Sequence, residues 1–149
     1  MIKAIVFDFD GLILDTEVPN YQTWSEIYES YGCSLPISTW ITCIGGSQDL
    51  FNPCGYLEKQ IGNSVDHEKI RVKHRKRFIE LVEAEPVMPG VEEYIADAKK
   101  LGLKVGVASS SSHEWVDSNL ERLGLIEYFD SIKCSDDVKQ VKPAPDVYL

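Results

Sequence analysis

The chain has 149 residues, of which 44% are hydrophobic and 26% charged; these are globular values, and they exclude a disordered or collagen-like chain. Its formal net charge of −9 argues against a nucleic acid or an anionic membrane surface as a partner, because both repel an acidic protein. No stretch approaches the roughly 18 apolar residues of a membrane-spanning helix, so none is predicted.

The four cysteines show no CxxC spacing, and the chain has only three histidines. A disulfide framework and a zinc site are therefore disfavoured, and free thiols in a reducing cytoplasm are predicted. Asp8 interrupts the N-terminal apolar run, so no signal peptide is predicted. The basic cluster Lys73–Arg77 is explained more simply as the solvated face of a helix than as a binding patch.

The first predicted element is a strand. Residues 2–7 form a dense, partly β-branched apolar run, which is short for a helix and suits a strand covered on both faces. The pattern then becomes that of amphipathic helices. The helices predicted in this stretch cover residues 20–31, 48–61 and 66–82, although Pro53 and Gly55 interrupt the second of them.

Strands and helices alternate after residue 84. "LKVGVAS" predicts a second buried strand, and "SSHE", Ser111 to Glu114, has the spacing of a capping box at the start of a helix. The elements predicted here, in order, are a helix between Gly90 and Gly102, the second strand, a helix ending before Gly124, a strand at 131–134 and a last helix starting in "KPAPDVYL".

This order of elements predicts an α/β protein. Residues 1–16 and 85–149 would form a Rossmann-like parallel sheet with its helices, and residues 17–84 would form a helical unit inserted after the first strand. The two passages between these parts could act as hinges.

The stretch "FDFDGLILDTE" places two aspartates at the end of the first predicted strand. Side chains two apart on a strand point the same way, so Asp8 and Asp10 are expected at the carboxyl edge of the sheet, where α/β proteins bind ligands. At roughly 6.7 Å and an effective dielectric of about 20, they would repel by about 2.5 kcal/mol. A nucleophile beside a proton donor, or a bound Mg²⁺, would exploit or relieve that repulsion. Taken alone, the motif fits equally well with two caps of a turn at Gly11.

Three segments, in order, resemble the signatures of the haloacid dehalogenase superfamily. "DFDGLILDTE" is similar to the first signature as it occurs in the sugar-phosphate phosphatase and β-phosphoglucomutase-like branch. "VGVASSS" resembles the second, a strand that ends in a hydroxyl residue, here Ser109, and "VKPAPDVYL" resembles the third, with Lys142. The helical insertion lies where this branch carries its cap, so the resemblance covers essentially the whole chain.

The resemblance implies a Mg²⁺-dependent phosphatase that hydrolyses a small phosphorylated metabolite, such as a sugar phosphate, through an aspartyl-phosphate. Asp8 would attack phosphorus, and Asp10 would protonate the leaving oxygen. Ser109 would donate a hydrogen bond to a phosphoryl oxygen, Ser110 beside it would contact the substrate, and Lys142 would bring a positive charge to Asp8 and the phosphate. The carboxylate of Asp8 and the main-chain carbonyl of Asp10 would hold the metal.

Within the insertion, "CIGGSQDL" resembles the segment that reaches toward substrate in this branch. Gly45, Gly46 and Gln48 are therefore candidate substrate contacts, although a plain turn before a helix explains the glycines equally well. Phosphomutases of the branch carry an arginine near the position of Gln48 to hold a second phosphate, so the neutral glutamine favours a hydrolase. Asp10 argues against a dehalogenase, whose halide leaving group needs no proton.

The fourth signature of the superfamily, a strand ending in acidic residues that completes the Mg²⁺ site, has no counterpart before Leu149. We therefore expect a truncated chain that is itself an incomplete enzyme, with the activity assigned to its parent protein. Asp136 and Asp137 are expected in the loop after the third strand rather than in the metal site. A phosphomutase, and a non-catalytic binding domain that kept the fold, remain the alternatives.

Overall fold

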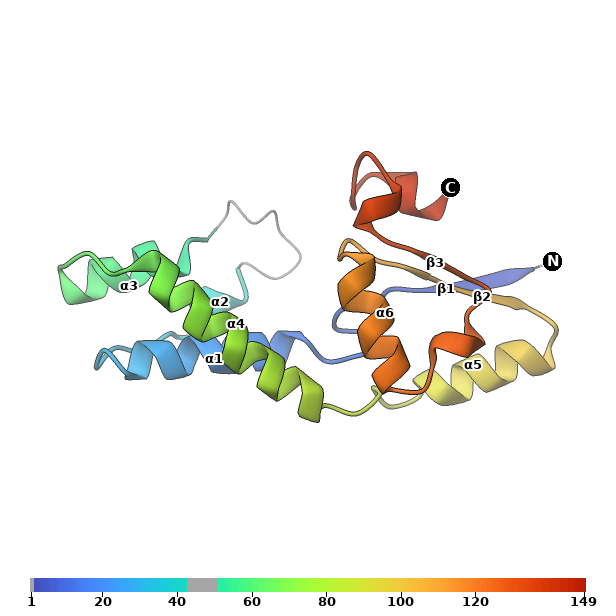
Figure 1. Cartoon of the computed structure of the whole chain (residues 1–149), viewed down its shortest axis with the longest axis horizontal. Helices are drawn as coiled ribbons and strands as arrows, with labels where there is room; N and C mark the ends of the chain where they lie inside the picture. Colours follow the sequence, from blue (N-terminus) through green and yellow to red (C-terminus); the bar gives the residue numbers. More distant parts are fainter. Residues whose placement is uncertain (1, 43–50) are drawn as a thin grey trace. The chain divides into compact units, whose positions relative to one another are not determined.

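Figure 1 presents the chain as a computed structural model, which describes residues 2–42 and 51–149. The chain divides into two compact units. One, the core unit, consists of Met1–Asp15 and Glu85–Leu149, and the other, the helical unit, consists of Thr16–Ala84. In the described part of the chain no helix is both long enough and apolar enough to cross a membrane.

A three-stranded parallel sheet forms the centre of the core unit. Its strands are β1 (Ala4–Phe7), β2 (Lys104–Ala108) and β3 (Ser131–Lys133), in the order β1-β2-β3. Helices α5 (Val91–Lys100) and α6 (His113–Arg122) follow the strand–helix–strand alternation (Figure 1). The predicted α/β fold with a parallel, Rossmann-like sheet is confirmed.

The prediction that the first strand is covered on both faces is wrong. Crossovers between parallel strands are right-handed, and both crossovers here step in the same direction across the sheet, so α5 and α6 belong on the same face. Alternation along β1 then buries Phe7, while Ala4 and Val6 lie on the other face and Val6 is 51% exposed.

Helix α6 begins one residue later than the predicted capping box. The side chain of Ser112, and not that of Ser111, accepts a hydrogen bond from the main-chain N–H of Trp115. His113 is therefore the first helical residue, and the hydroxyl of Ser111 is available for other contacts. The last predicted helix is a short 3₁₀ turn, η4 (Pro145–Tyr148), which follows another, η3 (Ser135–Asp137).

The helical unit contains four described helices, one more than predicted: α1 (Glu17–Glu29), α2 (Ile37–Trp40), α3 (Pro53–Ile61) and α4 (His67–Ala84). Helix α3 starts at Pro53 because a proline suits the first helical position and the side chain of Asn52 caps the N–H of Gly55. The predicted helix start at residue 48 lies outside the described residues. The core of this unit is largely aromatic and aliphatic: Trp24, Ile27, Tyr28, Leu35, Trp40, Cys54, Leu57 and Ile70.

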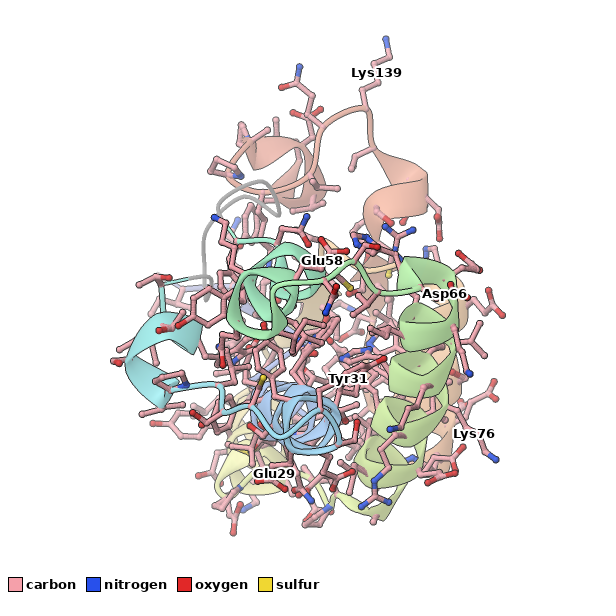
Figure 2. The ribbon with its side chains drawn as sticks, turned by 90° about the vertical axis from the view of Figure 1, so that its left-hand side faces the viewer. Glu29, Tyr31, Glu58, Asp66, Lys76 and Lys139 are labelled. Atoms are coloured by element: carbon pink, nitrogen blue, oxygen red, sulfur yellow. The ribbon has the colours of Figure 1, made fainter. Side chains whose placement is uncertain are left out.

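Side-chain pairs join α1 to α4 within the helical unit. Arg77 donates two hydrogen bonds to the carboxylate of Glu26, at 2.8 and 3.0 Å, and the imidazole of His74 lies 2.9 Å from the side-chain oxygen of Asn20. The remainder of the basic cluster is exposed, and Lys76 points away from α1 (Figure 2).

Candidate active site

The two aspartates lie on a tight loop that follows β1, not on the strand itself, which ends at Phe7. Phe9, between them, is fully buried and anchors the loop, and its carbonyl accepts a hydrogen bond from the N–H of Ile13 at 2.9 Å. Gly11 has a φ of 74°, a left-handed value that suits glycine, and its N–H donates to the carbonyl of Leu14 at 2.8 Å. The sequence therefore builds a rigid turn behind the two carboxylates.

Asp8 is held from one side only. Its Oδ1 lies 2.6 Å from Nζ of Lys142 and accepts a hydrogen bond from the N–H of Phe9 at 2.8 Å. The Asp8 side chain is 49% exposed and that of Lys142 22% exposed, and Nζ also lies 5.8 Å from the centre of the Tyr148 ring. Within the described part of the chain, no hydrogen bond or ion pair involves Oδ2 of Asp8, and because the side chain is half exposed a ligand can reach this oxygen.

Asp10 faces the loop between β2 and α6. Its Oδ1 accepts a hydrogen bond from Nε1 of Trp115 at 3.0 Å, and its Oδ2 accepts one from Oγ of Ser111 at 2.7 Å. Oγ of Ser109 lies 3.4 Å from the same Oδ2. Asp8 and Asp10 therefore have separate partners.

Ser109 continues the sheet beyond β2. It is fully buried, its N–H donates to the carbonyl of Lys133 at 2.9 Å, and its Oγ accepts the N–H of Ser111 at 3.0 Å. Ser110, next along the chain, is exposed. The core unit thus brings together Asp8 with Lys142, and Asp10 with Ser109, at the carboxyl ends of β1 and β2. Gly45, Gly46 and Gln48 lie outside the described residues.

The residues present fit Mg²⁺ through a small set of oxygen ligands. Both oxygens of the Asp10 carboxylate already accept hydrogen bonds, which leaves the carboxylate of Asp8 and the main-chain carbonyl of Asp10 as the candidates. Mg²⁺ suits such a site, because it prefers oxygen and usually keeps several of its waters. Over the residues that the structure describes, no cluster of three or more His, Cys, Asp or Glu side chains could hold a metal.

Asp136 and Asp137 bind α6 rather than forming a metal site. Nε2 of His113 lies 2.8 Å from Asp137, its Nδ1 lies 3.0 Å from Asp117, and its main-chain N–H donates to Asp136 at 2.6 Å. The hydrogen bond to Asp137, above all, raises the pKa of His113. Two hydrogen bonds lower the pKa of Asp137: the larger effect comes from the main-chain N–H of Cys134, and the next from the side chain of His113.

Sequence reasoning missed Trp115 altogether and gave Ser111 the wrong role. Ser111 precedes the N-cap Ser112 and Trp115 lies in the first turn of α6, so helical spacing does not relate the two side chains. The available signal was their position just after the second-signature serine. It was ambiguous because four consecutive serines, Ser109 to Ser112, offer several equivalent caps.

Comparisons with known proteins agree on one family. The family model described as "Haloacid dehalogenase-like hydrolase" matches residues 5–149. A protein of Bacillus subtilis (strain 168) named "Putative phosphatase YhcW" is 49% identical over the whole chain, which covers 67% of that protein. The "Phosphorylated carbohydrates phosphatase" of Thermotoga maritima is 31% identical over 99% of the chain, which covers 68% of that protein.

A solved structure shows the same fold over nearly the whole chain. The "putative beta-phosphoglucomutase from Thermotoga maritima" superposes with a TM-score of 0.79 at 25% sequence identity, and covers 99% of this chain and 68% of its own. The chain therefore spans about two thirds of the length of these related proteins.

Proposed function

Because the chain belongs to the haloacid dehalogenase-like hydrolases, we propose that it carries the active site of a phosphatase that hydrolyses a small phosphorylated carbohydrate. The family predicted from the three signatures, and with it the hydrolase class, is confirmed. The observation that carries the proposed chemistry is the ion pair between Nζ of Lys142 and Oδ1 of Asp8, at 2.6 Å. The relatives named as phosphatases support the reaction, and the one named for phosphorylated carbohydrates supports the substrate class.

In the proposed reaction Asp8 is the nucleophile. Its accessible oxygen attacks phosphorus, the bond between phosphorus and the ester oxygen breaks, and the departing alcohol takes a proton from Asp10. Water then attacks the aspartyl-phosphate, Asp10 takes a proton from that water, and inorganic phosphate leaves. Atoms and charges balance, with one ester bond and one water consumed.

The positive charge at Lys142 has two roles in this proposal. It orients Asp8 through Oδ1, so that Oδ2 faces the incoming phosphorus, and it offsets the repulsion between the carboxylate and the phosphate dianion. A Mg²⁺ ion held by Asp8 and the Asp10 carbonyl supplies further charge neutralisation when bound. Ser109 and the exposed Ser110 supply hydroxyl groups at the end of β2 for the phosphoryl oxygens.

We assign the helical unit the role of a substrate-selecting cap. The chain enters this unit at Thr16 and leaves it at Ala84, so the crossing points follow the Asp10 loop and precede α5. Gly45, Gly46 and Gln48 remain proposed substrate contacts of the cap.

The experiment is release of inorganic phosphate by the 149-residue chain, with and without Mg²⁺, from p-nitrophenyl phosphate and a panel of hexose phosphates. We expect Asp8→Asn to lose at least about a thousandfold in turnover, because the amide is not a nucleophile. The matched control is Asp97→Asn, since Asp97 is an exposed aspartate on α5 of the same unit, with a side chain 70% exposed.

Turnover that survives in Asp8→Asn would reject the proposed nucleophile. Transfer of phosphate to a second position of the hexose, without release, would assign a phosphomutase instead. A wild-type chain that releases no phosphate from any member of the panel would reject phosphatase activity for this chain, and would leave its family unchanged.

A further inference from the structure

We propose that Trp115 is the positioning residue of Asp10, acting together with Ser111. This inference rests on the proposed function, in which Asp10 exchanges a proton with the leaving group. It is carried by one piece of geometry, the indole Nε1 of Trp115 at 3.0 Å from Oδ1 of Asp10 with Oγ of Ser111 at 2.7 Å from Oδ2.

The two donors restrain Asp10 because they bind different oxygens of one carboxylate. A carboxylate with a single partner can still rotate about its terminal torsion, which is broad in free side chains. Partners on both oxygens fix that rotation. Oδ2 also lies 3.4 Å from Oγ of Ser109, but among the described residues Oδ1 accepts only the indole N–H and retains a second acceptor position, so Asp10 can still exchange a proton with a ligand at Oδ1 while both contacts persist.

The donors are themselves fixed by helix α6. The main-chain N–H of Trp115 donates to the capping hydroxyl of Ser112, and its carbonyl accepts from the side chain of Asn119 at 2.9 Å. The N–H of Ser111 donates to the fully buried Ser109 hydroxyl, and the Ser111 carbonyl accepts from the N–H of Ser135 at 2.9 Å. The position of Asp10 is thus set by the loop that ends the second signature together with the first turn of α6.

A direct test of the geometry uses the three tryptophan indole N–H signals in the ¹H–¹⁵N spectrum of the labelled chain. Trp115→Phe assigns the Trp115 signal. We expect Asp10→Ala to shift this signal and to accelerate its exchange with solvent at least tenfold, while the signals of Trp24 and Trp40 stay in place. Asp8→Asn is the matched control, because it changes an aspartate of the same loop that does not contact the indole.

A kinetic test separates positioning of a proton donor from general damage. A p-nitrophenolate leaving group needs little protonation, whereas the alkoxide of a hexose phosphate needs a proton to depart. We expect Trp115→Phe to lower kcat/KM for glucose 6-phosphate about tenfold more than for p-nitrophenyl phosphate. We expect Ser111→Ala to act in the same direction.

The control for the substitution is Trp40→Phe, which makes the same chemical change in the helical unit. Among residues 2–42 and 51–149, the buried indole nitrogen of Trp40 has no hydrogen-bond partner, so this variant removes no such bond within them. It should leave the ratio of the two kcat/KM values unchanged.

Either measurement can overturn the inference. A Trp115 indole signal that ignores Asp10→Ala would show that the hydrogen bond does not exist in solution. Equal losses for both substrates in Trp115→Phe would mean that Trp115 supports the fold and does not position Asp10. If the proposed phosphatase activity itself fails, the indole signal alone decides the contact, so the two failures are distinguishable.

Discussion

Two histidines, one in each unit, show how differently the two parts of the chain use polar side chains. In the helical unit, His74 packs between the rings of Trp24 and Phe78, with ring centres 4.7 and 5.9 Å away. Burial is the main reason that its pKa falls from 6.5 to about 4. In the core unit, His113 lies between the carboxylates of Asp117 and Asp137, and its pKa is raised. One residue type is therefore held neutral in one unit and favoured as a cation in the other.

Other polar groups also serve different purposes in the two units. In the helical unit they connect helices to one another, as when the hydroxyl of Tyr28 on α1 donates to the carbonyl of Pro53 on α3 at 2.6 Å. In the core unit they gather on the loops after β1 and β2, where Asp8 and Asp10 each have separate partners. We therefore expect substitutions in the core unit to change activity first, and those in the helical unit to change stability first.

The largest effect that we expect is on activity. Lys142→Met should lower kcat/KM a hundred- to a thousandfold, because it removes the positive charge beside Asp8 and the transferred phosphate. Lys139→Met is the control. Lys139 belongs to the same segment and extends into solvent (Figure 2), so this variant should keep its activity. Steady-state phosphate release measures both, and equal losses in the two variants would contradict a specific role for Lys142.

The next largest effect that we expect is a loss of stability without a change in the active site. Leu57 is fully buried in the core of the helical unit, and Leu57→Ala should lower the free energy of unfolding by about 2–5 kcal/mol through lost contacts and a cavity. Lys59→Ala, an exposed position on the same helix α3, should change it little. Urea unfolding followed by tryptophan fluorescence measures both variants. The contrast between the units would break down if Leu57→Ala shifted the Trp115 indole signal in the folded protein.

How far the sequence predicts these features depends on whether a feature is local. Helix periodicity and glycine stops predicted α1, α4, α5 and α6 to within a few residues, because those signals lie in the elements themselves. The exposed face of β1 was not predictable in this way, because it follows from the order of the strands and the direction of both crossovers.

The candidate site shows the same limit at finer scale. The pairing of Asp8 with Lys142 was expected from the resemblance, since the two residues belong to separate signatures of one family. The role of Ser111 could not be assigned, because in a run of four serines a shift of one residue decides which hydroxyl caps the helix and which reaches Asp10.

A smaller effect is expected from alanine substitutions at two glycines, one in each unit, which should cost similar stability but differ in their effect on activity. Gly11 (φ 74°) and Gly32 (φ 69°) are both left-handed, and Gly→Ala at either should cost about 1–2 kcal/mol of stability. Gly11 follows Asp10 directly, whereas Gly32 follows the end of α1. Thermal unfolding should therefore show similar losses, while phosphate release falls in Gly11→Ala alone. A comparable loss of activity in Gly32→Ala would argue against the division of roles between the units.

The smallest effect that we expect is a pair of opposite pH dependences. His74 has a folded pKa of about 4, below its ordinary 6.5, so the unfolded chain binds the extra proton first. Its contribution to stability is present above about pH 6.5 and is lost as the pH falls toward 4. The folded pKa of His113 is raised, so its contribution is complete below about pH 6.5 and is lost as the pH rises through that raised value.

These slopes can be measured as differences between each variant and its parent, which cancels the other carboxylates that titrate in this range. In a Trp115→Phe parent, fluorescence reports Trp24 and Trp40 of the helical unit, and adding His74→Phe should flatten the decline between pH 6.5 and 4. In a parent with Trp24→Phe and Trp40→Phe, it reports Trp115 of the core unit, and His113→Asn should remove the stabilisation seen at low pH.

The groups facing His113 are Asp117, Asp136 and Asp137, with Lys133 3.9 Å from Asp137, so the surrounding charge is mainly negative. If the stability contributions of His74 and His113 changed with pH in the same direction, burial would not be what lowers the pKa of His74, or ion pairing would not be what raises that of His113.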